Sequence, residues 1–228
     1  MDLSEHYNNL YIESSKAILE GNYKPDTQIN NTSDSRFGIT LLIRPNEIVK
    51  ANIRLFLEDL KTIEPNQYYY PDSDIHITVM SIISCYEDFS LDQITIRDYI
   101  DVIQQSLVHL DKIKIEFRGV TASASAIMIQ GFPTEDSLDN FRDKLRENFK
   151  KSTLEQSIDS RYSIATAHST VMRFQEKPEN PEQLIQAVAK FRDHDFGGFQ
   201  VKNLELVYND WYQRQKNTIH LADFYIAN

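Results

Sequence analysis

Apolar side chains recur every three or four positions in five segments of the chain, which is the spacing of a helix that buries one face. The clearest case follows Asn46, where Val49, Ile53, Phe56 and Leu60 fall on one stripe. This periodicity, together with polar and proline residues at the segment starts, sets the expected boundaries. We predict helices over residues 1–20, 46–63, 94–109, 134–149 and 180–192.

Three of these segments begin with a residue that can cap a helix. Asn46, Thr134 and Asn180 carry side-chain oxygens that can accept hydrogen bonds from the free N–H groups of a first turn. Asn180 also precedes Pro181, and proline is favoured at the first helical position. We therefore expect helices to start directly after these three residues.

Stretches rich in β-branched and aromatic residues, bounded by turn-forming residues, lie between the helical segments and indicate strands. We predict strands in residues 36–45, 75–82, 112–123, 126–133, 163–174, 199–208 and 218–227. Strands and helices alternate through the whole chain, which indicates an α/β or α+β protein.

The domain organisation follows from length and from one polar stretch. A chain of 228 residues can bury a sizeable core as a single domain with room for two lobes. Residues 22–35 are almost entirely polar and are typical of a loop. We therefore expect an N-terminal helix and loop over residues 1–35, followed by the main domain over residues 36–228.

Composition narrows the class of protein. Hydrophobic residues make up 41% and charged residues 25%, which is ordinary for a soluble globular protein. No apolar run approaches the roughly 18 residues of a membrane helix, so no membrane partner is expected. The first residues are acidic and polar, unlike a secretory signal, and we expect a cytoplasmic protein.

Charge and cysteine content exclude further classes. The formal net charge of −10 argues against a protein that coats long nucleic acid, because such binding needs many Lys and Arg residues to neutralise phosphates. A small phosphate ligand in a local pocket stays possible. Cys85 is the single cysteine, so no intrachain disulfide can form, and its flanking residues supply no activating group; we interpret it as a structural thiol.

Two of the six histidines stand in the same five-residue frame. The first frame is His-Ile-Thr-Val-Met, starting at His76, and the second is His-Ser-Thr-Val-Met, starting at His168. Successive side chains of a strand alternate between its faces, so each histidine should share a face with the threonine two positions later, Thr78 or Thr170. Two such strands facing one another would bring two imidazoles and two hydroxyls together.

That combination suits phosphodiester cleavage, which needs one group to remove a proton from the attacking hydroxyl and another to protonate the leaving oxygen. Histidine can do either near neutral pH. His76 and His168 are the predicted acid and base pair, and Thr78 and Thr170 are expected to bind the phosphate oxygens. This chemistry requires no metal and no cofactor.

At these residues the sequence resembles the two-histidine phosphoesterase superfamily, whose signature is a pair of His-x-Thr/Ser-hydrophobic motifs. The superfamily includes LigT-like RNA 2′,3′-cyclic phosphodiesterases, cyclic phosphodiesterases and 2′-5′ oligoadenylate phosphodiesterases. The resemblance implies an α+β fold of two pseudo-symmetric lobes, each a small antiparallel sheet backed by helices, with the motifs facing a central groove. It also implies catalysis by His76 and His168 and phosphate binding by Thr78 and Thr170.

Other side chains are candidates for substrate contacts. Tyr208, Trp211 and Tyr212 lie at the predicted tip of the last hairpin, where aromatic rings could stack on a base, and Tyr70 leads into the first motif. Regular alternation places Arg173 on the strand face opposite His168, so it is expected to point away from the site unless the strand bulges.

Two alternative functions remain open at this point. Asp72 and Asp74, followed by His76, could bind a divalent ion, although their spacing matches no known rule and the segment is typical of a turn. The same groove could also belong to a non-catalytic module that binds nucleotides or RNA ends. His6, His109 and His220 have no partner in the sequence and are interpreted as structural. His194 lies at a predicted helix end, where we expect it to complement the helix dipole.

The sequence thus predicts a metal-independent phosphodiesterase. Its expected substrate is a small nucleotide or a short RNA with a 2′,3′-cyclic, 2′-5′ or related phosphodiester. The motif does not select among these linkages.

Overall fold

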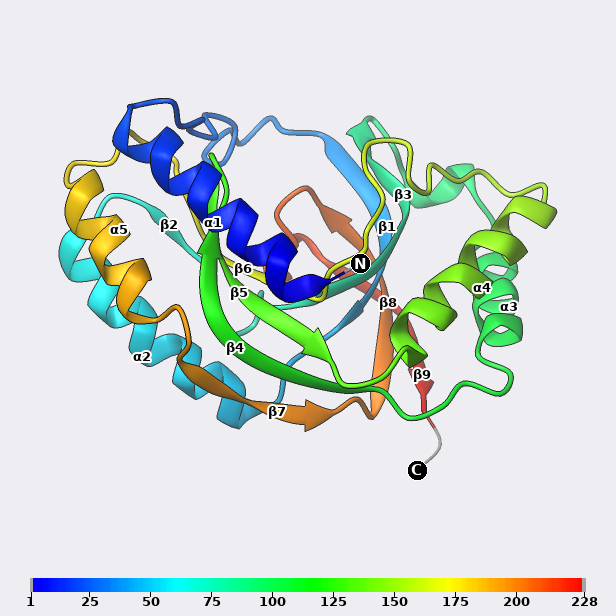
Figure 1. Ribbon diagram of the computed structural model, residues 1–228. Coiled ribbons are helices and arrows are strands. Elements are labelled where there is room, and N and C mark those ends of the chain that lie inside the picture. Colours follow the sequence, from blue (N-terminus) through cyan, green and yellow to red (C-terminus); the bar gives the residue numbers. More distant parts are fainter. Residues whose placement is uncertain (1, 227–228) are drawn as a thin grey trace.

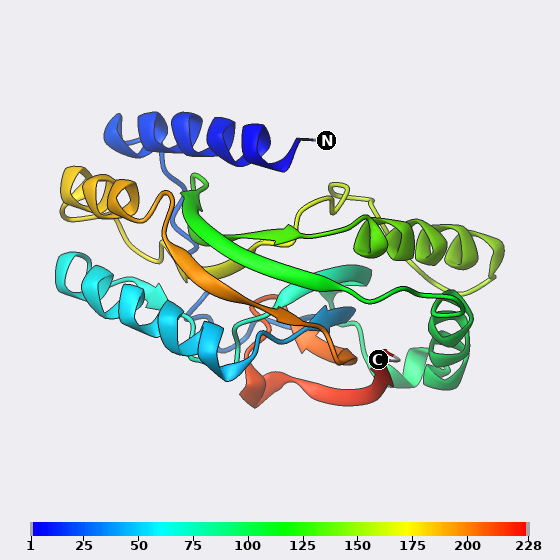
Figure 2. The ribbon, with the colours of Figure 1, turned by 60° about the horizontal axis from the view of Figure 1, so that its bottom comes forward.

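Two antiparallel sheets, lying one above the other in the view of Figure 2, form the centre of the molecule. The computed structural model describes residues 2–226. The four-stranded sheet has the order β3-β1-β8-β9, with strands Ile77–Glu87, Arg36–Ile43, Asn203–Asp210 and Ile219–Tyr225. The five-stranded sheet has the order β2-β6-β5-β4-β7, with strands Tyr68–Tyr69, Ser169–Arg173, Ala126–Pro133, Lys114–Ala122 and Asp195–Gln200.

The helices gather at the two ends of this pair of sheets (Figure 1). Helices α2 (Glu47–Ile63) and α5 (Pro181–Lys190) lie at one end, where α2 packs on β7. Helix α1 (Leu3–Leu19) runs from this end across the five-stranded sheet and packs on β4. Helices α3 and α4 lie at the other end, where α3 packs on β9 and α4 on β3; they span Ile96–Ser106 and Ser137–Lys151. Each antiparallel sheet is therefore backed by helices, which confirms the predicted two-lobed α+β fold.

The predicted helices are present, with differences at their starts. Asn46 caps α2 through a hydrogen bond of 2.9 Å from the backbone N–H of Val49 to its side-chain oxygen, as predicted. Thr134 was the wrong cap, because the chain leaves β5 at Pro133 and enters α4 only after Asp136. Helix α5 does begin at Pro181, but the side chain of Asn180 makes no capping bond.

One predicted strand was wrong, because residues 199–208 belong to two strands in different sheets. Strand β7 ends at Gln200 in the five-stranded sheet, and β8 begins at Asn203 in the four-stranded sheet. Between them Val201 is buried, and its N–H donates to the carbonyl of Ile113. Val201, which in the sequence pattern continued a single strand, is thus a buried residue at the point where the chain crosses from one sheet to the other.

The other strands are shorter than predicted at some ends. Strand β6 covers only Ser169–Arg173, and residues 152–168 run to it without a helix or strand. Strand β9 ends at Tyr225, and residue 227 of the predicted strand lies outside the described residues.

The N-terminal segment is fixed to the five-stranded sheet. Tyr7 of α1 is 1% exposed, and its hydroxyl donates to the carbonyl of Gly131 in β5. In return, the hydroxyl of Thr121 in β4 donates to the carbonyl of Tyr7. These buried polar contacts tie α1 to the sheet in addition to its apolar packing.

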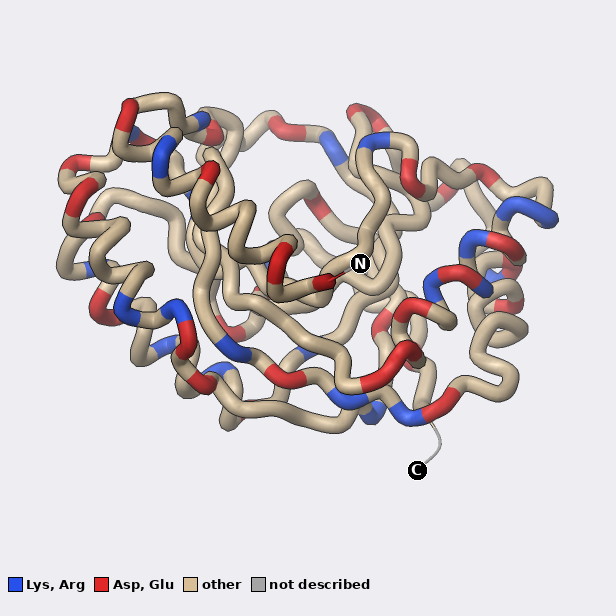
Figure 3. The backbone as a smooth tube through the Cα atoms, in the orientation of Figure 1, with Lys and Arg blue, Asp and Glu red and all other residues tan. Residues whose placement is uncertain are grey.

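Charged residues lie mainly on the outer helices, where Lys and Arg alternate with Asp and Glu along the backbone (Figure 3). Most of the backbone of the central strands is free of charged residues in the same view. No helix within residues 2–226 has the length and apolar content needed to cross a membrane.

Candidate active site

Both motif histidines stand directly before a strand, and they line one cavity. His76 precedes β3 of the four-stranded sheet, and His168 precedes β6 of the five-stranded sheet. Thr78 and Thr170 line the same cavity, whose volume is about 150 Å³. The two sheets therefore bring together, across the space between them, the four residues that the sequence pattern singles out.

A bulge at the valine of each motif changes the direction of the following side chains. In β3, Thr78 pairs with Leu42 and Met80 with Leu41, so Val79 has no partner of its own. In β6, Thr170 and Met172 likewise pair with adjacent residues of β5, which leaves Val171 as the extra residue. The valine and the methionine are both buried, and alternation resumes one residue out of phase.

The bulge brings Arg173 into the cavity, so the expectation for an unbroken strand does not hold and the exception for a bulge applies. Arg173 lines the cavity together with Thr170, three positions earlier. Its Nε donates to the hydroxyl of buried Tyr70 at 2.9 Å. On the other motif strand the corresponding position is Ser81, which also lines the cavity.

The hydrogen bonds of the two histidines differ in kind. Nδ1 of His76 lies 2.7 Å from the backbone carbonyl oxygen of Asp74. A carbonyl can only accept, so this bond requires a proton on Nδ1 and leaves Nε2 of the neutral ring free to take up a proton. Nδ1 of His168 lies 2.7 Å from the hydroxyl of Thr166, which can donate or accept.

Both imidazoles are held in the neutral form at pH 7. The pKa of His76 is lowered from 6.5 to about 4, chiefly by burial and further by the guanidinium groups of Arg44 and Arg173. The pKa of His168 is also lowered to about 4, chiefly by burial and then by Arg142 and Arg173. An anion placed between the rings would oppose these effects and raise both pKa values.

A buried arginine links the backbones of the two motif segments. Arg142 of α4 is 1% exposed, and its guanidinium donates to the carbonyl oxygens of Thr78 at 3.0 Å and Val79 at 3.1 Å. It also donates to the carbonyl of Thr166 at 2.8 Å, two residues before His168. One rigid group thus binds the bulge of the first motif and the approach to the second.

The predicted aromatic contacts are only partly brought to the cavity. Tyr70, Trp211 and Tyr212 line it, whereas Tyr208 does not: its ring stacks on Phe37 and its hydroxyl donates to a backbone carbonyl. Tyr212 is buried, and the guanidinium of Arg173 lies 5.7 Å from its ring centroid. Tyr212 therefore supports Arg173 and does not present a free face to a ligand.

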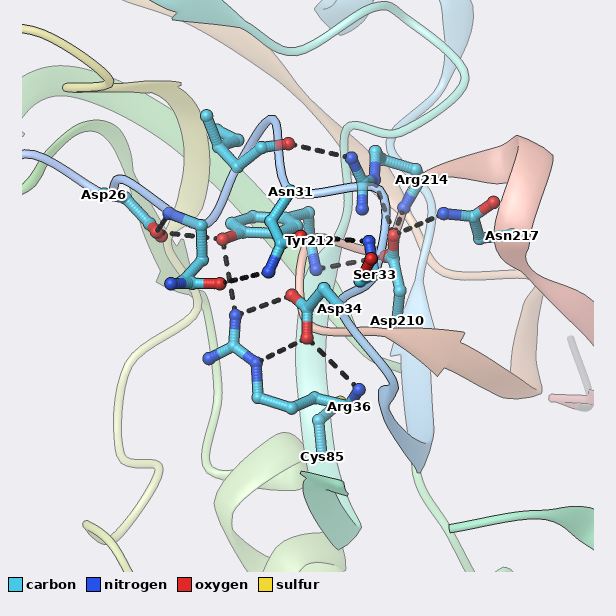
Figure 4. Close-up of polar contacts among 12 residues, drawn as sticks. Asp26, Asn31, Ser33, Asp34, Arg36, Cys85, Asp210, Tyr212, Arg214 and Asn217 are labelled. Atoms are coloured by element: carbon cyan, nitrogen blue, oxygen red, sulfur yellow. Dashed lines mark hydrogen bonds and ion pairs between the residues drawn. The ribbon is translucent and has the colours of Figure 1, made fainter. Parts of the chain in front are cut away.

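The loop that carries Trp211 and Tyr212 is held by the N-terminal segment (Figure 4). The hydroxyl of Tyr212 donates to the carboxylate of Asp26 at 2.9 Å, and Arg214 donates to the carbonyl of Ile29 at 3.0 Å. Within the loop, the carboxylate of Asp210 accepts from the backbone N–H groups of Tyr212 and Arg214. Residues 22–35 thus support one wall of the cavity.

Sequence reasoning missed a second group of cavity residues. They come from the irregular segment 157–164, from β1, and from the end of β8 and its loop: Thr40, Ser157, Asp159, Ser160, Arg161, Tyr162, Ile164, Asn209 and Gln213. Cys85 also lines the cavity; burial raises the pKa of its thiol to about 12, so the thiol stays protonated. Segment 157–164 has no regular secondary structure, so its sequence contains no periodic pattern from which its position at the cavity could be predicted.

The carboxylates of the alternative metal site are engaged elsewhere. Asp72 pairs with Arg54, and the side chain of Asp74 accepts from Ser73 and from the backbone N–H of Gln215. Within residues 2–226, no three His, Cys, Asp or Glu side chains lie close enough together to hold a metal ion. The geometry gives this alternative no support.

Comparisons by sequence find nothing: no protein-family model and no curated protein matches the chain. Comparisons by structure find clear similarities. The protein TT0787 of Thermus thermophilus matches with a TM-score of 0.59 and 14% identity, over 84% of this chain and 97% of that one. LigT of E. coli, in a complex with 3′-AMP, matches with a TM-score of 0.55 and 8% identity, over 85% of this chain and 99% of that one.

A third solved structure, described as a phosphoesterase, matches with a TM-score of 0.55 and 10% identity, over 85% of this chain and 99% of that one. At such identities the similarity concerns the fold. The chain therefore has the two-lobed α+β fold seen in LigT of E. coli and in the solved phosphoesterase, which is the fold that the resemblance of the two motifs implied.

Proposed function

We propose that the protein is a metal-independent phosphodiesterase that acts on a 2′,3′-cyclic, 2′-5′ or related phosphodiester of a nucleotide or short RNA. The observation that carries this proposal is the meeting of both His-x-Thr motifs and Arg173 in one cavity. The LigT-like fold supports it, because a similar structure is described as a phosphoesterase and another holds 3′-AMP.

The charges of the cavity suit an anion. Arg161 and Arg173 line it, and their hydrogen bonds go to a backbone carbonyl and a tyrosine hydroxyl, both uncharged. The carboxylate of Asp159 is the acidic group among the described lining residues, and it pairs with Arg146 at 2.6 Å. A protein of net charge −10 thus keeps a cationic pocket at this point.

The two imidazoles supply the proton transfers. A neutral imidazole removes a proton from the attacking hydroxyl or water as its oxygen bonds to phosphorus. The other imidazole, protonated once the anionic substrate raises its pKa, gives its proton to the leaving oxygen as the P–O bond breaks. Thr78, Thr170 and Arg173 donate hydrogen bonds to the non-bridging oxygens, where negative charge grows in the transition state.

The test is an incubation of the purified protein, in the presence of a chelator, with 2′,3′-cyclic nucleotides, linear 2′-5′ and 3′-5′ oligonucleotides and ADP-ribose cyclic phosphate. We expect a hydrolysed product from at least one substrate. His76→Ala and His168→Ala should each lower kcat by roughly 10²–10⁴-fold, the usual contribution of one acid or base. Thr78→Ala and Thr170→Ala should lower it less.

His220→Ala is the matched control, because this exposed histidine of β9 is not among the cavity residues and should leave kcat unchanged. Abolition of activity by the chelator would favour the metal alternative. Binding of nucleotides without any turnover would favour the non-catalytic module.

A further inference from the structure

Two side-chain oxygens, on residues that line the cavity, are buried and have no hydrogen-bond partner within the described part of the chain. They are Oδ1 of Asn209, in β8, and Oε1 of Gln213, in the following loop. Asn209 is 1% exposed and Gln213 is 6% exposed, and both line the cavity. Buried polar groups are nearly always paired, so two unpaired acceptors in one cavity need an explanation.

The orientation of Asn209 is fixed by its own amide nitrogen. Its Nδ2 donates to the backbone carbonyl of Asp210 at 2.8 Å and approaches the sulfur of Cys85 at 3.7 Å. Turning the amide over would place its oxygen against that carbonyl and lose the bond. Oδ1 is therefore held as an acceptor and needs an N–H or O–H group from elsewhere.

Gln213 is held near Asn209 by an unusual backbone. Its φ is 59°, in the left-handed region that non-glycine residues seldom adopt. Its N–H donates to the carbonyl of Asp210, the residue that also binds Asn209. The side chain makes no hydrogen bond to residues 2–226 and so keeps both an acceptor and a donor for a ligand.

We propose that Asn209 and Gln213 form a recognition subsite for a nucleobase that carries an exocyclic amino group. An amino group has two N–H donors, one for the held Oδ1 of Asn209 and one for Oε1 of Gln213, whereas a keto oxygen in its place would face the lone pairs of Asn209. The free Nε2 of Gln213 can donate to a ring nitrogen beside the amino group, as glutamine does when it binds adenine.

The surrounding side chains suit a base in this position. Trp211 and the exposed Tyr162 line the cavity beside the amides, and an aromatic ring of this kind can lie against a base. Two guanidinium groups lie over the indole of Trp211, that of Arg161 at 4.6 Å and that of Arg36 at 4.9 Å from its ring centroid, so Tyr162 is the freer ring. This inference depends on the proposed function in one respect: it assumes that the phosphate of the ligand binds at the two His-x-Thr motifs.

The test compares two ligands that differ in one amino group. Calorimetry with 3′-AMP and with the 3′-monophosphate of purine riboside, which lacks the 6-amino group, measures the preference without any turnover. We expect 3′-AMP to bind roughly tenfold more tightly, as for the loss of a buried hydrogen bond. Gln213→Met should lower this ratio at least threefold, while Gln183→Met on the exposed face of α5 should leave it unchanged.

The variant should fold, because methionine has nearly the shape of glutamine and removes a buried group that is unpaired in the free protein. The melting temperature of Gln213→Met should therefore stay the same or rise, which separates lost recognition from lost structure. Equal binding of the two ligands, or an unchanged ratio in Gln213→Met, would overturn the proposal and leave the amides as binders of solvent. Failure of both ligands to bind would overturn it as well.

The outcomes also separate this inference from the proposed hydrolysis. If no diester is cleaved but 3′-AMP is preferred, the hydrolysis is wrong and the subsite stands. If diesters are cleaved with no preference for the amino group, the subsite is wrong and the hydrolysis stands.

Discussion

Replacing Arg142 with methionine should destabilise the protein and loosen both motifs at once. The change keeps the apolar stem but leaves three carbonyl oxygens, those of Thr78, Val79 and Thr166, without this buried donor. Each unpaired acceptor costs about 1–3 kcal/mol, and partial relaxation offsets some of the sum, so we expect a loss of about 3–5 kcal/mol. In a chain of this size that corresponds to a melting temperature lower by roughly 6–20 °C.

Thermal and urea unfolding, followed by circular dichroism, measure the effect. Arg97→Met is the matched control, because Arg97 lies on α3, its side chain is 72% exposed, and it forms an exposed ion pair with Asp101 at 2.9 Å. An exposed pair of this kind contributes less than about 1 kcal/mol. Equal losses in the two variants would refute the role assigned to the buried guanidinium.

The same substitution has a second readout that a purely structural effect would not produce. The charge of Arg142 is one of the causes that lower the pKa of His168, but it is not among those that act on His76. Removing it should raise the pKa of His168 and move that of His76 much less. NMR titration of the two imidazoles measures both, and equal shifts would contradict the reasoning.

Three further predictions concern the neighbourhood of the site. Because burial raises the pKa of Cys85 to about 12, a thiol reagent at pH 8 should label it only after unfolding; fast labelling of the native protein would contradict this. The pKa values of His76 and His168 lie near 4 when folded and 6.5 when unfolded, so the free energy of unfolding should fall between about pH 6.5 and 4, by at most roughly 3 kcal/mol per histidine. The His76→Asn, His168→Asn double variant should lose most of this slope, and an unchanged slope would show that other groups cause it. In Gly131→Ala the new Cβ would lie 2.0 Å from the carbonyl oxygen of Ala167, the residue before His168, so that residue must move. The melting temperature and the activity of the variant should therefore both fall. Wild-type values for both would refute this.

The regular parts of the fold could be predicted from the sequence because local rules govern them. The stripe of Val49, Ile53 and Phe56 after Asn46 identified α2, its cap and its buried face. The alternating residues of β4 and the apolar run of β5 likewise located two strands, which the structure pairs antiparallel. In α2 and in the first half of β4, the pattern that marks the element also determines which side it buries.

Arg173 was misplaced because the alternation rule assumes an unbroken strand. The sequence did contain a signal of the break: Val and Met stand side by side after each motif threonine, although only one of two neighbours can face the core in a regular strand. Both are buried in both motifs, Val79 with Met80 and Val171 with Met172. Adjacent apolar residues in an otherwise alternating strand thus indicate a bulge.

The far wall of the cavity could not be predicted, because it is assembled from segments that are distant in sequence. Asn209 and Gln213 lie at the end of β8 and in its loop, Arg161 lies in an irregular segment, and Asp26 holds their neighbour Tyr212 from the N-terminal loop. No local periodicity connects these positions. Their proximity follows from the packing of the two sheets and from side-chain hydrogen bonds that only the folded chain reveals.

The two halves of the site share a backbone but differ in charge. The same bulge turns the fifth residue after each histidine into the cavity, and that residue is Ser81 in one half and Arg173 in the other. On the proposed function, a phosphate bound between His76 and His168 would meet a guanidinium on the side of β6 and a hydroxyl on the side of β3. On the proposed subsite, the base would be held by Asn209 and Gln213, which belong to the four-stranded sheet and its loop, whereas Arg173 belongs to the five-stranded sheet. A substrate that satisfies both can enter this pseudo-symmetric groove in only one orientation.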